Sequence, residues 1–137
     1  RPRHSNDNGL AETKNGAVIR KQLGYEHIPQ CFAAAVNAFC AEHLNPYLNF
    51  HRPCLFAEEI ADKKGKIRKR YPQRLVMTPF EKLASLDHGQ QFLRRGVTLE
   101  FLRRQAASIS DNDGTTRLNE ARTQLFISIH KRSKNAA

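Results

Sequence analysis

The spacing of apolar positions predicts that most of this chain is helical. Between Pro29 and about Leu44, apolar side chains recur at intervals of three and four residues, which is the period of one helical face. Pro46 is expected to end or kink this helix, because proline has no amide hydrogen and clashes with the preceding turn. One further apolar turn is expected at 47–50. The predicted face comprises Phe32, Ala35, Val36, Phe39, Cys40 and Leu44.

Other helices are predicted on both sides of this segment. One runs from about Asn8 to Leu23, with Gly24 as its C-terminal stop. A short helix at 78–86 begins with Thr78 as the capping residue and Pro79 at the first helical position. Two amphipathic stretches follow at 98–109 and 116–131, and the polar segment 110–114 between them is interpreted as a linker.

A basic β-hairpin is predicted in the middle of the chain. Residues 54–57 lead into the connection and residues 67–71 return, with Gly65 supplying the positive φ that a tight turn needs. It is either a solvated tip, partly balanced by Glu58, Glu59 and Asp62, or a ribbon that contacts phosphates. Its cations are Lys63, Lys64, Lys66, Arg68, Lys69 and Arg70.

Together these elements predict a mainly helical α+β fold. Three segments are expected: helices over 1–53, the basic hairpin and a short helix over 54–90, and a helical extension over 91–137. The balance of 23 Lys+Arg against 13 Asp+Glu gives a net charge of +10, which favours a polyanionic partner, with nucleic acid ahead of an anionic membrane. No apolar run is long enough to span a bilayer, so no membrane partner is expected.

The cysteines and histidines offer no metal-binding pattern. Cys31, Cys40 and Cys54 are odd in number and lack CxxC spacing, so they are interpreted as buried free thiols in a reducing cytoplasm. The six histidines lack the close pairing of zinc-binding helices. His43, on the second predicted helix, and His51, after that helix, are expected to be rim residues.

One carboxylate is a candidate catalytic group. Glu12 lies about one turn into the first predicted helix, behind the polar residues 6–8, and Arg20 and Lys21 follow on that helix. This layout is typical of the last acidic metal ligand of a phosphoryl-transfer enzyme acting on DNA. A glutamate in a first turn can also serve only to complement the helix dipole.

The order of several motifs resembles the end of the integrase core, and the region after it, in bacterial insertion-sequence DDE transposases. The similarity covers about Arg1 to Leu86 and is weak from Gln90 onward. The matching segments are 1–8, 12–21 and 24–25 around Glu12, Asn49-Phe50-His51-Arg52-Pro53 as an "NFxxP" segment, 65–71 as the basic hairpin, and Thr78-Pro79-Phe80-Glu81-Lys82-Leu83 as a "TPxxRL" helix start.

The resemblance implies that the chain follows the last strand of a ribonuclease-H-like core. In such a core, two aspartates and one glutamate hold two Mg²⁺ or Mn²⁺ ions for in-line displacement at a phosphodiester. Glu12 matches the glutamate, and Arg20, Lys21 and Lys14 are candidate DNA contacts. Neither aspartate can be assigned, so this chain alone is expected to bind no metal and to lack activity.

Three functions stay open. The first is the C-terminal portion of a DDE transposase that binds DNA in the bacterial cytoplasm. The second is a non-catalytic DNA-binding or assembly module, and the third is a basic RNA-associated protein. A homodimer is expected, because the first helix, cut from the sheet it covers in the family, would expose Val18 and Leu23.

Overall fold

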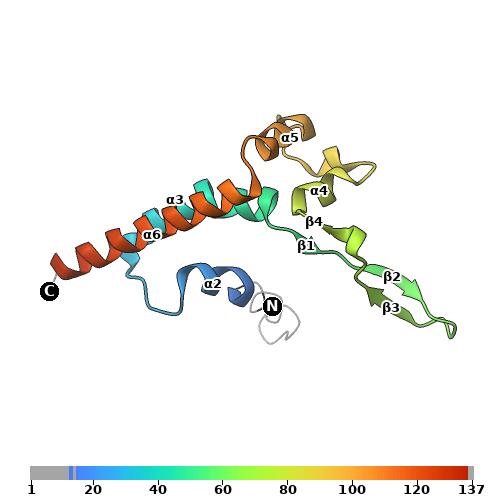
Figure 1. Cartoon of the computed structure of the whole chain (residues 1–137), viewed down its shortest axis with the longest axis horizontal. Helices are drawn as coiled ribbons and strands as arrows, with labels where there is room; N and C mark the ends of the chain where they lie inside the picture. The colour runs from blue at the N-terminus through green and yellow to red at the C-terminus, as the bar shows by residue number, and fades with distance from the viewer. Residues whose placement is uncertain (1–12, 14, 136–137) are drawn as a thin grey trace.

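The fold is mostly helical, with two small antiparallel sheets, which confirms the predicted α+β class at this level. The computed structural model describes residue 13 and residues 15–135, and side chains up to residue 131. Two long helices lie side by side, a short N-terminal helix lies against them, and a narrow β-ribbon projects from one end (Figure 1). No helix in the part of the chain that the structure describes is long and apolar enough to cross a membrane.

The N-terminal helix consists of η1 (Asn15–Ile19) and α2 (Arg20–Leu23). It ends at Gly24, whose amide donates to the carbonyl of Arg20 at 2.9 Å, so the predicted end is confirmed. The predicted start near residue 8 lies outside the described residues. Leu23 is buried in the core and Val18 packs against it, so the exposed apolar face expected on this helix is wrong.

A single helical segment runs from residue 30 to residue 51. It comprises η2 (Gln30–Phe32), α3 (Ala33–Phe39), η3 (Cys40–Leu44) and η4 (Tyr47–His51), with residues 45 and 46 also helical. Pro46 therefore does not end the helix. The turns on both sides of it are π-helical, and the amide of Asn45 donates to Cys40 O, five residues back. Such wide turns accommodate a proline that cannot donate to the normal ladder.

The core lies where α6 (Asp111–Asn135) packs antiparallel along this segment (Figure 1). Buried side chains come from both helices at helical spacing, as the apolar pattern predicted, although Ala35 is exposed. On the side of the N-terminal helix, Arg122 donates to the side-chain oxygen of Gln22 at 3.3 Å. The buried cluster comprises Leu23, Phe32, Phe39, Leu44, Leu118, Leu125 and Ile129.

The segment 110–114 was predicted to be a linker. In the structure it forms the start of α6. Ser110 Oγ accepts the amide of Asp113 at 3.1 Å, which satisfies one of the free donors of the first turn. A close approach favours glycine at Gly114, because a Cβ there would lie 3.0 Å from the ring of His51, which would have to shift. His51 is buried, with its Nδ1 3.0 Å from Asp111 Oδ1, so its predicted place at the rim is also wrong.

The strands form a longer ribbon than the predicted hairpin. β1 (Cys54–Leu55) pairs with β4 (Val76–Met77), and further out β2 (Glu58–Ala61) pairs with β3 (Ile67–Arg70). The outgoing strand of the basic hairpin is therefore 58–61 rather than 54–57. Between the two sheets, the amide of Phe56 donates to Leu75 O at 3.1 Å, within the short 3₁₀ turn η5 (Gln73–Leu75).

The remaining helices pack beside the base of the ribbon. α4 (Pro79–Ala84) has Thr78 as its cap, as predicted, and the structure adds a full capping box, in which Glu81 N donates to Thr78 Oγ1 and Thr78 N to a carboxylate oxygen of Glu81. After η6 (Gly89–Phe92) comes α5 (Leu99–Ala107). The side chain of Gln90 ties this region together, donating to Val97 O at 2.8 Å and accepting from Leu99 N at 2.9 Å.

Candidate nucleic-acid interface

The basic ribbon β2–β3 is the most exposed and most highly charged element in the described structure. Its register pairs Glu58 with Arg70 and Ile60 with Arg68, so these four residues share one face. Every residue from 63 to 70 is exposed. The ribbon points away from the helical body, and among the described residues no helix packs on either side of it (Figure 1). Its cations are therefore accessible to a large partner.

Most of the ribbon's positive charge is not neutralised by the acidic residues on the opposite strand. Arg68 Nε lies 3.2 Å from Asp62 Oδ2, whereas Glu58 pairs with Arg74 beyond the ribbon. The predicted balance by Glu58, Glu59 and Asp62 therefore holds only for Asp62. Within the described residues, no carboxylate lies within ion-pair distance of Lys63, Lys64, Lys66, Lys69 or Arg70.

Asp62 organises the turn that presents these cations. Its Oδ1 accepts the amides of Lys64 at 2.9 Å and Lys66 at 3.0 Å. Gly65 has a φ of 75°, as the predicted turn requires. The amides of Lys66 and Lys64, followed by Arg68, favour the charged carboxylate and lower the pKa of Asp62.

We expect replacement of Asp62 by alanine to loosen the turn, so that the amides of Lys64 and Lys66 exchange with solvent several-fold faster. Acid should lower the protection of the same amides, taken as the observed exchange rate relative to the intrinsic rate at that pH, because intrinsic exchange itself slows as acid is added. Because the pKa is lowered in the folded chain, the carboxylate stabilises the turn fully above the ordinary aspartate pKa, and this contribution is lost as the pH falls through the lower folded value. Amide exchange measured by NMR tests both, with Asp87→Ala as a control. Equal exchange in the Asp62 and Asp87 variants would contradict this role.

The other predicted site residues lie apart from the ribbon or outside the described residues. Arg20 and Lys21 are exposed on α2, beneath the helix pair, and the guanidinium of Arg20 lies 5.3 Å from the ring centroid of Tyr25 (Figure 1). Glu12 and Lys14 fall outside the described residues. The structure therefore brings together six of the predicted DNA contacts, namely Lys63, Lys64, Lys66, Arg68, Lys69 and Arg70.

The described residues contain no group of three His, Cys, Asp or Glu side chains that could hold a metal ion. Cys31, Cys40 and Cys54 are free, as predicted, but Cys31 is exposed and the other two are only half-buried. Burial raises the pKa of the Cys40 thiol. The expectation that all three are buried is therefore wrong.

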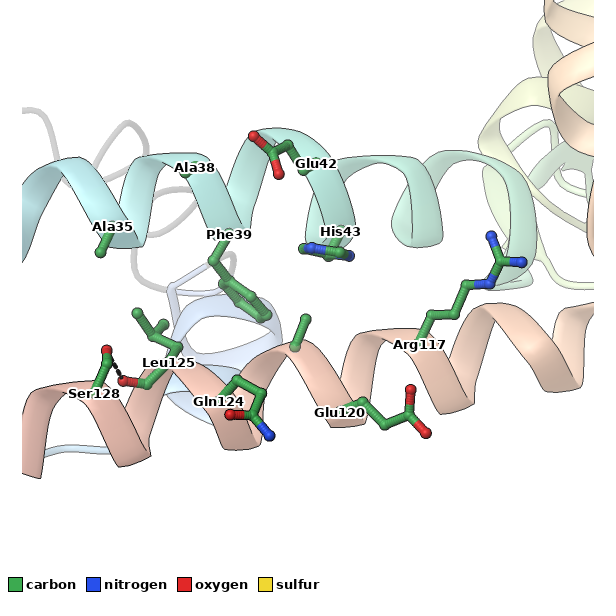
Figure 2. Close-up of a pocket in the computed structure, with 11 residues that line it drawn as sticks. Ala35, Ala38, Phe39, Glu42, His43, Arg117, Glu120, Gln124, Leu125 and Ser128 are labelled. Carbon is green, nitrogen blue, oxygen red and sulfur yellow. Dashed lines mark hydrogen bonds between the residues drawn. The ribbon is translucent and has the colours of Figure 1, made fainter.

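An open groove of about 570 Å³ runs between α6 and the 30–51 segment. Figure 2 shows side chains from both helices along this groove. Its floor is apolar, with Phe39, Leu125 and three alanines, Ala35, Ala38 and Ala121, while charged side chains line its rim. Small residues of this kind let another helix approach closely, so the groove suits protein packing better than catalysis.

A second basic surface, in the segment 92–108, was not predicted from the sequence. Exposed aromatic rings at Phe92 and Phe101 occur in the same segment as four exposed arginines. The arginines alone look like ordinary solvated side chains. The signal in the sequence is the spacing of Phe101, Arg104, Gln105 and Ser108 along one face of a helix.

Comparison with known proteins yields no match to a protein-family model, to a curated protein or to a solved structure.

Proposed function

We propose that this chain is the C-terminal portion of a DDE-type transposase and that its basic ribbon binds duplex DNA. The observation that carries the proposal is the exposed, two-stranded ribbon with six cations. An isolated ribbon of two strands is marginally stable in water and buries no apolar face of its own. The major groove of DNA admits an element of this width, and phosphates neutralise cations placed along it.

The order of motifs supports the choice of a transposase over other DNA-binding proteins. The capping box at Thr78-Pro79 and the helix carrying Asn49 and Phe50 lie at the base of the ribbon, and Phe50 and Phe80 pack edge to face with centroids 5.6 Å apart. Two of the segments that resemble the family therefore contact each other. The coding sequence upstream of Arg1 tests the class, since it must then encode strands that carry two aspartates.

Strand transfer is proposed only for the complete enzyme. Mg²⁺ or Mn²⁺ would there supply Lewis-acid stabilisation at the phosphodiester. This chain offers Glu12 as one carboxylate, and its described residues gather no further ligand set. Its own contribution is therefore to bind and position DNA.

The ribbon proposal predicts a specific change in the salt dependence of duplex binding. Lys69→Ala combined with Arg70→Ala should lower the slope of log K against log[salt] by about 2, because each lost phosphate contact removes about 0.9. The control variant, Lys131→Glu, changes the net charge by the same two units at an exposed position on α6 and should keep the wild-type slope. Fluorescence anisotropy over a salt series measures both.

Two outcomes would overturn the ribbon proposal. In one, wild-type protein fails to bind duplex DNA at low salt. In the other, the two variants change the slope equally, so that only overall charge matters. The same titration with RNA of matching sequence separates the alternative of an RNA-associated protein, which would bind RNA tightly at moderate salt.

A second copy of this chain is the proposed protein partner. Since Leu23 is buried, the surface originally expected to mediate dimerisation is already covered. The groove between α6 and the 30–51 segment remains open. Its lining carries both signs of charge, from Arg117, Glu42 and Glu120. A twofold arrangement could place these charges opposite one another across the interface.

A further inference from the structure

A shallow hollow on α5 carries the side chains that an unpaired nucleotide requires. Its volume is about 360 Å³, and it is lined by Phe101, Arg104, Gln105 and Ser108. These residues lie at i, i+3, i+4 and i+7, so a single face of α5 supplies an aromatic ring, a guanidinium, an amide and a hydroxyl. Ser108 Oγ donates to Gln105 O at 2.7 Å, which fixes the hydroxyl at the C-terminal end of the hollow.

The opposite side of α5 is packed, which leaves this face toward solvent. Leu99, Leu102 and Ala106 are half-buried. Leu102 lines an apolar cavity with Phe50, Phe80 and other side chains of η4 and α4. The helix therefore has one anchored face, while Phe101 on the outer face remains 45% exposed.

The chain segment that carries the hollow has more cations than carboxylates. Glu100 and Asp87 are the only carboxylates between residues 86 and 108. Within the described residues, none of the four arginines in this segment is in an ion pair. Phe92, 66% exposed, is a second exposed ring in the same segment of the chain. The arginines are Arg94, Arg95, Arg103 and Arg104.

We infer that this face of α5 binds unpaired bases of a nucleic-acid strand, with Phe101 stacking on a base and Arg104 contacting the adjoining phosphate. Rings interleaved with arginines are the usual chemistry of single-strand binding, because every base offers a π-face and every linkage a charge. A closed duplex hides these base faces, so the ligand is a single-stranded stretch. α5 and the ribbon lie at the same end of the helix pair, so one DNA molecule can contact both (Figure 1). The inference therefore rests on the DNA-binding function proposed for the ribbon.

Three labelled DNAs test the inference by fluorescence anisotropy: a blunt duplex, the duplex with a single-stranded overhang, and the duplex with an abasic overhang of equal charge. Wild-type protein should bind the normal overhang about 5- to 100-fold more tightly than the abasic one. Phe101→Leu should abolish that preference, because leucine keeps an apolar side chain but has no ring face. Phe101→Tyr should retain it, and Arg104→Ala should weaken binding to both overhangs alike.

A matched control, Ile127→Ala, removes an exposed apolar side chain from α6 and should leave all three affinities unchanged. Equal wild-type affinity for normal and abasic overhangs would overturn the inference, and so would a base preference that survives in Phe101→Leu. Binding to the blunt duplex reports on the ribbon alone. Normal duplex binding without base preference therefore refutes only the α5 site, whereas loss of all binding refutes the proposed function.

Discussion

Replacing Leu44 with alanine is expected to lower the free energy of unfolding by about 3 kcal/mol, within the range of about 2–5 kcal/mol for leucine truncations in cores. Leu44 is only 1% exposed and lies in the cluster that joins α6 to the 30–51 segment. The loss combines the transfer of the removed methyl groups with the cavity left between two helices. A domain stable by about 5–15 kcal/mol would lose a large share of its stability.

Urea denaturation followed by circular dichroism measures this loss. Leu55→Ala is the matched control, since Leu55 is 64% exposed in β1 and should change stability by less than about 1 kcal/mol. If the two variants were equally stable, the packing of α6 along the 30–51 segment would not be the main source of stability.

Dimerisation through the groove between α6 and the 30–51 segment is expected to be abolished by Ala38→Glu. The new carboxylate would be placed on the apolar floor, where a second copy has to remove it from water. Wild-type protein should then show the mass of a dimer in light scattering at micromolar concentration, and the variant that of a monomer. The expected loss of affinity is at least about 100-fold, as for an unpaired buried charge.

Ala34→Glu is the control for this experiment, because Ala34 is also exposed near the start of α3 but does not line the groove. Both variants add the same charge to the same helix. A wild-type monomer at all concentrations would refute the dimer. Equal dissociation of both variants would show that the groove is not the interface.

The helices were predictable from sequence where packing leaves a local signature. The apolar stripe from Phe32 to Leu44 repeats because one side faces α6, and Thr78-Pro79 marks a helix start because the cap is made within four residues. The ribbon was misplaced because Glu58–Ala61 shows no clear alternation of buried and exposed residues. Without one buried face, a sequence does not specify strand boundaries.

The wrong prediction at 110–114 and the continuation of the helix past Pro46 have a shared cause in distant contacts. Continuation of the helix past Pro46 brings His51 against the first turn of α6, and Gly114 provides the space for its ring. His51 and Asp111 are sixty residues apart in the sequence. The local sequence pattern therefore indicates only that Gly114 interrupts a helix. At the candidate site, the positions of the cations could be predicted from the sequence. Their exposure and their lack of ion-pair partners could not, because both depend on how β2 pairs with β3.

The contact between His51 and Asp111 also defines how the chain is routed. The polypeptide leaves the two-helix core at residue 51 and re-enters it at residue 111, with only 3.0 Å between the bonded atoms of the two side chains. The residues between them, including the ribbon and α5, therefore form an insertion between the two helices of the core. Any pull exerted on this insertion by a bound strand reaches the core through this junction and through the packing of Phe80 and Leu102 against Phe50 on η4.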